Sequence, residues 1–312
     1  MQFDVLGRAF RAGNLPPELG ARVRHAWDFP EHQGPAANYR VDLDSGPVDL
    51  TPWQSYAPRQ VLACGEHFEV RVAPDSFAFE DATGALICRH VPGATLIRLQ
   101  QRPEGGVASP ELEAALYVGV NEGLWCSGLL PLHAASAALE GSACAFVGPS
   151  GRGKSSTLMR AVRAGWVPVA EDVLWCDPQR WLVYGWEHEV RLLPDSVALL
   201  PPALAHQQWH TTADGKVNVP YAALPGAGVS RGGVPLRRLA VLEREPGLPS
   251  AWLPLSTREA TLALWEATGL PLAQRARQYA AEHIAALQVN VECLRLRLGS
   301  TPLPLATSEF AH

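Results

Sequence analysis

The chain contains a complete match to the phosphate-binding pattern G-x-x-x-x-G-K-[ST]. The matching residues are Gly148, Pro149, Ser150, Gly151, Arg152, Gly153, Lys154 and Ser155. The apolar run ACAFV precedes them and STLMRAVRAG, which has helical spacing, follows them, so the context is the strand, loop and helix of a P-loop. Glycines let backbone N–H groups surround phosphate oxygens, and the start of the helix adds partial positive charge. We therefore expect this loop, with the following Ser156, to bind ATP. Lys154 would contact the β- and γ-phosphates, and the Ser155 hydroxyl would contact Mg²⁺.

Ionisable residues flank the P-loop on both sides. Glu171 and Asp172 follow Lys154 by seventeen and eighteen residues and interrupt the apolar run WVPVAEDVLWCD. Adjacent carboxylates at the end of a buried strand are costly unless they hold a cation or act on a proton; a solvated strand end is the alternative. His133 precedes Lys154 by twenty-one residues, in LLPLHAASAAL. Taken alone, a histidine in such a run is more often a hydrogen-bonded core residue than a functional one.

A P-loop indicates nucleotide binding and leaves the reaction open, because motors, transporters, GTPases and kinases all use it. A mechanical or transport ATPase would carry an LSGGQ-like signature, which VSRGGVPL matches poorly, and its acidic pair would lie farther downstream. A nucleotide-binding regulatory module would bind ATP without turnover. Both remain alternatives to a kinase.

The intervals between His133, the P-loop and Glu171-Asp172 resemble those of the catalytic domain of HPr kinase/phosphorylase and its relatives. In that family a histidine precedes the P-loop by a similar interval, and an acidic pair follows its lysine in a V-A-D-D type strand, here VPVAEDV. The likeness spans roughly residues 107 to 200. It implies an α/β P-loop kinase core that transfers the γ-phosphoryl group of ATP to a serine or threonine hydroxyl. In these roles Glu171 would accept the proton, Asp172 and Ser155 would hold Mg²⁺, and His133 would support the acidic pair or the γ-phosphate.

The chain departs from the bifunctional enzymes of that family in several positions. Glu171 stands where the family has Asp, and Ser156 stands where the bifunctional enzymes have Glu. Their later glycine-containing signature is also not evident, so neither the phosphorylase activity nor the hexamer carries over. What remains resembles a kinase-only branch that includes kinases acting on a serine of lasso-peptide precursors. The resemblance therefore implies a peptide or protein substrate that bears a serine.

Two basic residues downstream are candidates for substrate contacts. Arg191, in YGWEHEVRLLPDSVALL, lies in a segment that lines the substrate side in the similar family, and its fork geometry suits a phosphate or a carboxylate. Lys216 follows Asp214-Gly215 in a hairpin-type turn from which it could reach a phosphate. Arg191 could equally be a surface residue, and for Lys216 a solvated turn is the more common situation.

Length and composition indicate the domain organisation and the classes of partner to expect. The chain has 312 residues, of which 47% are hydrophobic and 18% charged, and a net charge of −5. We expect two regions, a β-rich region at 1–105 and a P-loop kinase domain at 106–312 that ends in helices. The mild acidity provides no field suited to nucleic acid, and no run is long enough to span a membrane. We expect a cytoplasmic protein with no nucleic acid or membrane partner, and the sequence leaves its oligomeric state open.

Overall fold

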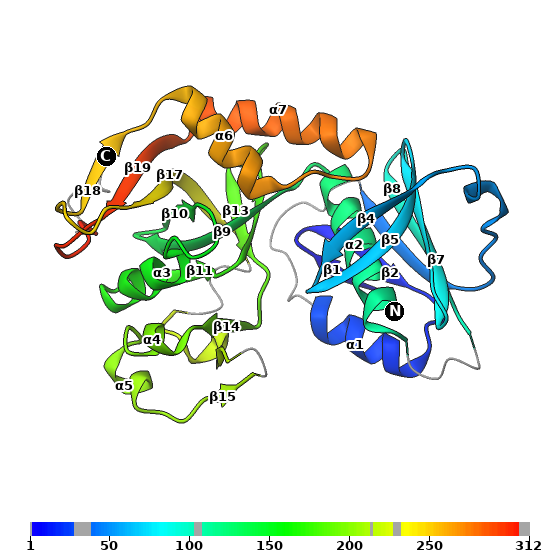
Figure 1. The fold of residues 1–312 in the computed structure, drawn as a ribbon, viewed down its shortest axis with the longest axis horizontal. Coiled ribbons are helices and arrows are strands. Elements are labelled where there is room, and N and C mark those ends of the chain that lie inside the picture. The colour runs from blue at the N-terminus through cyan, green and yellow to red at the C-terminus, as the bar shows by residue number, and fades with distance from the viewer. Residues whose placement is uncertain (1, 28–38, 103–107, 213–214, 227–231, 306–312) are drawn as a thin grey trace. The chain divides into compact units, whose positions relative to one another are not determined.

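The structure is a computed structural model that describes residues 2–27, 39–102, 108–212, 215–226 and 232–305. The chain has a mixed α/β fold and divides into two compact units (Figure 1). The first unit comprises Met1–Leu129 and Leu270–Ala281, and the second comprises Leu130–Gly269 and Glu282–His312. None of the helices formed by the described residues combines the length and the apolar character needed to cross a membrane.

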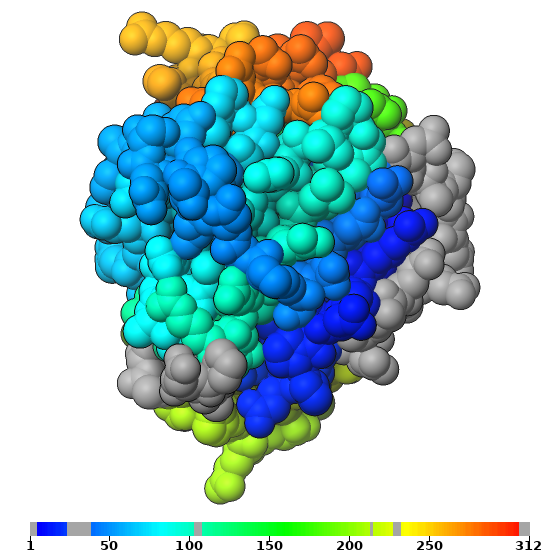
Figure 2. Space-filling view, turned by 90° about the vertical axis from the view of Figure 1, so that its right-hand side faces the viewer, coloured from blue at the N-terminus to red at the C-terminus, as the bar shows by residue number. Residues whose placement is uncertain are grey.

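The first unit is built on an eight-stranded sheet in the order β1-β2-β3-β8-β7-β6-β5-β4. Its strands are β1 (Gln2–Val5), β2 (Arg8–Ala12), β3 (Arg40–Ser45), β4 (Pro58–Ala63), β5 (Glu66–Ala73), β6 (Ser76–Glu80), β7 (Gly84–Val91) and β8 (Ala94–Gln101). β3 pairs in parallel with β2 and β8, and helix α1 (Pro17–Trp27) lies between β2 and β3 in the sequence. A short 3₁₀ helix, η1 (Thr51–Trp53), follows β3. Figure 2 shows the surface of this unit, with its strands in blue and cyan.

Helix α2 (Pro110–Cys126) belongs to the first unit. Ser109 caps it by accepting the Leu112 N–H, and Pro110 is its first residue, as the sequence predicts. The apolar side chains of the helix are buried against β7 and β8. Because that burial ties α2 to the N-terminal sheet, the division between the units falls after this helix, whereas the predicted boundary at 105/106 lies before it.

The second unit contains another eight-stranded sheet, in the order β10-β9-β12-β13-β17-β19-β18, with β11 paired to β9 and β10 also paired to β17. Its strands are β9 (Leu130–Leu139), β10 (Ser142–Val147), β11 (Val167–Ala170), β12 (Val173–Asp177), β13 (Leu182–Gly185), β17 (Val234–Arg244), β18 (Ala251–Pro254) and β19 (Glu292–Leu298). A three-stranded sheet is made of β14 (Glu189–Leu192), β16 (Val217–Pro220) and β15 (His210–Thr211). The helices are α3 (Lys154–Arg163), α4 (Pro194–Val197), α5 (Pro202–Ala205), α6 (Thr257–Thr268) and the later part of α7 (Gln274–Asn290), with the 3₁₀ turn η3 (Tyr221–Ala223).

The β9–β10 hairpin introduces the P-loop. Its turn residues Glu140 and Gly141 have φ of 52° and 79°, the left-handed values of the tight turns that suit the twist of paired strands. β10 then pairs in parallel with β17, and β17 with β19, so the three strands direct their carboxyl ends to one edge of the sheet. Ligands of α/β sheets bind at this edge. The P-loop follows β10 there.

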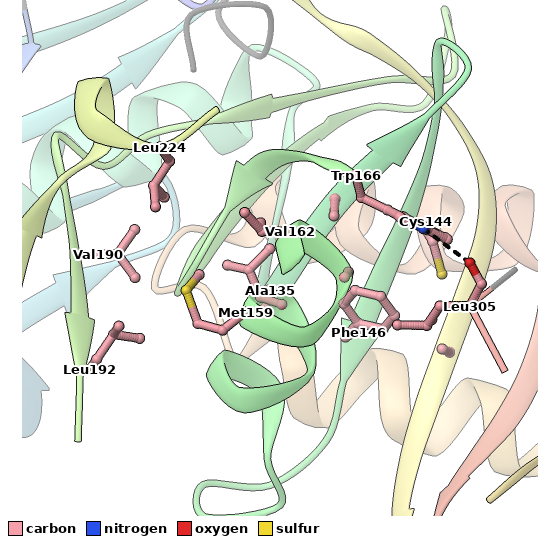
Figure 3. Close-up of a cluster of buried hydrophobic side chains, with 14 of the residues drawn as sticks. Ala135, Cys144, Phe146, Met159, Val162, Trp166, Val190, Leu192, Leu224 and Leu305 are labelled. Carbon is pink, nitrogen blue, oxygen red and sulfur yellow. Dashed lines mark hydrogen bonds between the residues drawn. The ribbon is translucent and has the colours of Figure 1, made fainter. Parts of the chain in front are cut away.

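A buried apolar cluster fixes α3 against the strands (Figure 3). Met159 and Val162 of α3 pack in the same cluster as Phe146 of β10 and Val190 of β14. At its far side the indole N–H of Trp166 donates to the Leu305 carbonyl at 3.2 Å. The helix that begins at the P-loop is therefore held by core packing rather than by its own propensity.

The C-terminal part of the chain contains the predicted helices. Ser256 and Glu259 form the reciprocal capping box that the sequence predicts for α6, and this helix ends before Gly269. The helix expected at about residues 272 to 287 is α7. Asp214, in the predicted hairpin-type turn, lies outside the described residues.

Candidate functional site

The P-loop connects β10 to α3 as the sequence predicts. Gly151 and Gly153 have φ of 78° and 98°, so both occupy the left-handed region that strains any residue with a Cβ. A Cβ at Gly153 would also lie 3.1 Å from Leu298 of β19. Pro149 to Arg152 form the exposed tip of the loop. This backbone shape is available to glycine and allows amides to turn toward an anion.

Lys154 begins α3 and folds back over the loop. Its Nζ donates to the Gly148 carbonyl at 2.9 Å, and the residue is buried. Burial lowers the pKa of Lys154, and the nearby carboxylates of Asp172 and Glu171 partly offset this effect. The loop thus holds a cation at its centre, close to the acidic pair.

Glu171 is joined to the P-loop itself. The Ser155 hydroxyl donates a hydrogen bond to Glu171 Oε1, and the backbone N–H of Arg191 donates to the same carboxylate. Glu171 is only 7% exposed, and burial raises its pKa, with the two hydrogen bonds acting in the opposite direction. A carboxylate and a hydroxyl in contact are two oxygen ligands of the type that Mg²⁺ takes together with phosphate oxygens and water.

The acidic pair forms a bend between β11 and β12, which are both partners of β9. β11 pairs with β9 as far as Ala170 opposite Ser136, and β12 resumes with Val173 opposite His133. Glu171 and Asp172 are the two residues in between, and the Asp172 carbonyl accepts the Ala134 N–H at 3.1 Å. Since Ala134 also pairs with Val147 at the end of β10, this register brings the bend and the P-loop to neighbouring strand ends.

His133 meets Asp172 at this edge. Its Nδ1 lies 3.2 Å from Asp172 Oδ1, and the two side chains are 48% and 55% exposed. Burial lowers the pKa of His133; the Asp172 carboxylate acts to raise it, and the charges of Lys154 and Lys216 lower it further. The structure therefore places His133 beside Asp172, and both side chains are partly exposed to solvent.

Glu187 is a member of the site that the sequence reasoning missed. It lies between β13 and β14, and its Oε1 accepts the N–H groups of Asp172, at 2.7 Å, and of Val173. Burial raises the pKa of Glu187 to about 7. The only signal in the sequence is a further acid after an apolar strand, in the run WEHEV, and no spacing rule selects it.

The remaining predicted residues lie at different places around the site. Arg191, on β14, is exposed, and its backbone N–H donates to the Glu171 carboxylate. Lys216 precedes β16, and its charge acts on both Glu171 and His133. The hydroxyl of Ser156 is 3.0 Å from that of Ser196 in α4, so it ties α3 to its neighbour.

Carboxylates, a lysine, a histidine and a hydroxyl thus converge on one P-loop from β9, α3, the β11–β12 bend and the segment after β13. Within the described ranges, no group of three or more histidine, cysteine, aspartate or glutamate side chains could hold a metal ion alone. The donor set present fits a Mg²⁺ ion carried by a nucleotide, which needs few protein ligands.

No model of a known protein family and no curated protein matches the chain.

Proposed function

We propose that this chain is an ATP-dependent kinase with a core of the HPr-kinase type, which transfers the γ-phosphoryl group to a serine or threonine hydroxyl of a peptide or protein. One observation carries the proposal: the acidic pair beside the P-loop is bonded to the P-loop hydroxyl through Glu171 and to an accessible histidine through Asp172. An accessible carboxylate beside a histidine can orient an incoming hydroxyl for attack on the γ-phosphate, which a kinase requires for its acceptor.

The chemistry required of the P-loop is electrostatic. Its backbone N–H groups and Lys154 would stabilise the charge on the transferring group, which in phosphoryl transfer supplies most of the catalysis. Mg²⁺, when bound with the nucleotide, would neutralise charge on the β- and γ-phosphates, with Ser155 and one carboxylate as protein ligands.

The geometry favours a division of roles that reverses the one implied by the family resemblance. Glu171 is buried against the Ser155 hydroxyl, which suits the metal side, whereas Asp172 is half exposed beside His133, which suits the acceptor side. The acceptor oxygen would attack the γ-phosphorus as the bond to the ADP oxygen breaks, and the hydroxyl proton would pass to Asp172. His133 would hold that carboxylate in place.

The nature of the acceptor rests on the resemblance. A lasso-peptide precursor that ends in serine is the substrate it suggests, and Lys216 and the exposed Arg191 would supply positive charge near it. A cytoplasmic location, where ATP is available, accompanies this proposal.

Intact-mass spectrometry tests the function directly. The protein is incubated with ATP, Mg²⁺ and either a lasso-type precursor peptide ending in serine or HPr. We expect one acceptor to gain the mass of one phosphoryl group, with the gain greatly slowed in Asp172→Asn and kept in Arg160→Ala, an exposed substitution on α3. ATP hydrolysis without a mass gain would favour an ATPase, and binding without hydrolysis would favour a regulatory module.

The same assay separates the roles of the two acids. Asp172→Asn should lower kcat by roughly 100-fold or more, the usual contribution of a general base, at an unchanged Mg²⁺ requirement. Glu171→Gln should raise the Mg²⁺ concentration needed for half-maximal rate. The opposite pattern would restore the roles implied by the resemblance.

A further inference from the structure

The bend that carries the acidic pair interrupts the regular strand pairing along β9. Glu171 and Asp172 lie between the part of β9 that pairs with β11 and the part that pairs with β12. A backbone N–H that leaves a ladder needs another acceptor, either water or a group of the protein. At this bend the acceptor for the N–H groups of both Asp172 and Val173 is one atom, Oε1 of Glu187.

The chain holds Glu187 in that place from two directions. β13 pairs with β12 as far as Gly185 opposite Leu174, so the next residues continue alongside the start of β12. Trp186 then packs on Trp175 with ring centroids 5.7 Å apart, and the backbone N–H of Trp186 donates to Glu187 Oε2 at 3.3 Å. The carboxylate is therefore bonded at both oxygens and is aimed at the bend by packed neighbours.

We propose that Glu187 is a positioning residue for phosphoryl transfer, which sets the direction of the Asp172 carboxylate and the distance of Glu171 from Ser155 by fixing the backbone between them. This inference rests on the proposed function and adds a residue to it. Glu187 touches neither nucleotide nor acceptor in this scheme. It acts through the two amides alone.

A purely structural role would make different predictions from a positioning role. If Glu187 only stabilised the fold, its loss would lower the melting temperature and the fraction of active protein, and the remaining molecules would turn over normally. If it positions the bend, the folded protein keeps its affinity for ATP, because Glu187 bonds the amides of the bend and not the phosphate-binding backbone of the P-loop, and loses kcat. A misplacement of about 1 Å can cost roughly 100-fold in rate.

The experiment compares three substitutions at Glu187 with a matched control in the same segment. Glu187→Ala removes the acceptor, Glu187→Gln keeps an oxygen that can accept both amides, and Glu187→Asp withdraws the carboxylate by one methylene. The control is Glu189→Ala, two residues along, where the exposed glutamate bonds Asn218 and not the bend. Each variant is measured for kcat, for KM of ATP and for amide hydrogen exchange over residues 167–177.

We expect Glu187→Ala to lower kcat by roughly 10- to 100-fold with KM for ATP changed less than about twofold. The amides of Asp172 and Val173 should lose protection in the same variant. Glu187→Gln should restore both properties, Glu187→Asp should fall between, and Glu189→Ala should match the wild type. If Glu187→Ala does not fold, the kcat of Glu187→Asp decides the question by the same criterion.

A wild-type kcat in Glu187→Ala, or equal losses of kcat in Glu187→Gln and Glu187→Ala, would overturn the positioning role. Failure of the proposed function is a separate result, in which the wild-type protein phosphorylates neither acceptor. The hydrogen-exchange comparison can be made even if the protein has no kinase activity. Unchanged protection of the Asp172 and Val173 amides in Glu187→Ala would by itself refute the anchoring of the bend by Glu187.

Discussion

At the scale of single residues, the charges at the P-loop balance one another through contacts that the chain makes before any nucleotide binds. Lys154 lies near both carboxylates of the bend, and its Nζ is bonded to the Gly148 carbonyl. Glu171 is bonded to the neighbouring Ser155. A nucleotide with its Mg²⁺ would replace these internal bonds with bonds of the same polarity, so little reorganisation is needed on binding.

Replacement of Lys154 tests this balance. Lys154→Ala should lower kcat/KM for ATP by at least about 100-fold, because the cation facing the β- and γ-phosphates is lost. The fold should persist, since the core around α3 consists of apolar side chains that the substitution does not touch. The rate is measured by phosphoryl transfer and the fold by circular dichroism, with Arg160→Ala on the same helix as the control. A retained rate would exclude the kinase assignment.

The residues of the site differ in how far their sequence reveals them. The P-loop motif and the intervals to His133 and Glu171-Asp172 can be read directly, because they reflect strands that pair in a fixed order. Glu187 is hidden because its contacts are to backbone amides, whose need for an acceptor arises only when β9 changes partners. The contact of Arg191 with Glu171 is likewise hidden, because it is made by the backbone N–H of Arg191 and so leaves no trace in the residue type.

At the scale of elements, α2 and the start of α7 are linked within the first unit by one buried acid. Both oxygens of Glu122 accept backbone N–H groups just before α7, from Leu272 at 2.7 Å and Ala273 at 2.9 Å. Groups at the start of a helix have no partners within it and carry partial positive charge, so a carboxylate there is stabilising. Glu122 is 2% exposed, and burial raises its pKa to about 7.

The elevated pKa of Glu122 predicts a pH-dependent stability. A carboxyl whose folded pKa lies above its unfolded value of 4.5 binds its proton more tightly in the folded protein. The contribution of Glu122 to the free energy of unfolding is therefore complete below pH 4.5 and is lost as pH rises through 7. The shift corresponds to about 3 kcal/mol of unfolding free energy. Denaturant unfolding between pH 4.5 and 8 should show this decrease in the wild type relative to Glu122→Gln.

The comparison with Glu122→Gln removes other titrations from the result. Burial lowers the pKa of His90 from 6.5 to about 4. The folded protein therefore loses stability as pH falls from 6.5 toward 4, and this loss is the same in the wild type and in Glu122→Gln. An exposed substitution on α6, Glu266→Gln, should leave the pH profile of the wild type unchanged. Parallel profiles for the wild type and Glu122→Gln would contradict the assignment.

At the scale of the whole molecule, local patterns predict the elements better than their partners. Capping at Ser109 and Ser256 and the alternation of the short strands predict helices and strands from neighbouring residues alone. The sheet of the second unit instead depends on pairs far apart in the chain, such as β10 with β17 and β17 with β19. For the same reason the sequence predicts α2 as a helix but does not indicate that it packs on β7 and β8, which lie earlier in the chain.

The division into two units makes a prediction about where a nucleotide acts. Every residue assigned to the site, from His133 to Lys216, belongs to the second unit. Addition of ATP or ADP with Mg²⁺ to the full chain should slow amide hydrogen exchange at Gly148 and at residues 150–155, whose N–H groups would donate to phosphate oxygens. Exchange in the strands β1 to β8 of the first unit should be unchanged. Lys154→Ala should show no slowing at the same nucleotide concentration. Protection in the first unit without protection in the P-loop would place the nucleotide elsewhere, and with it the chemistry proposed for Glu171 and Asp172.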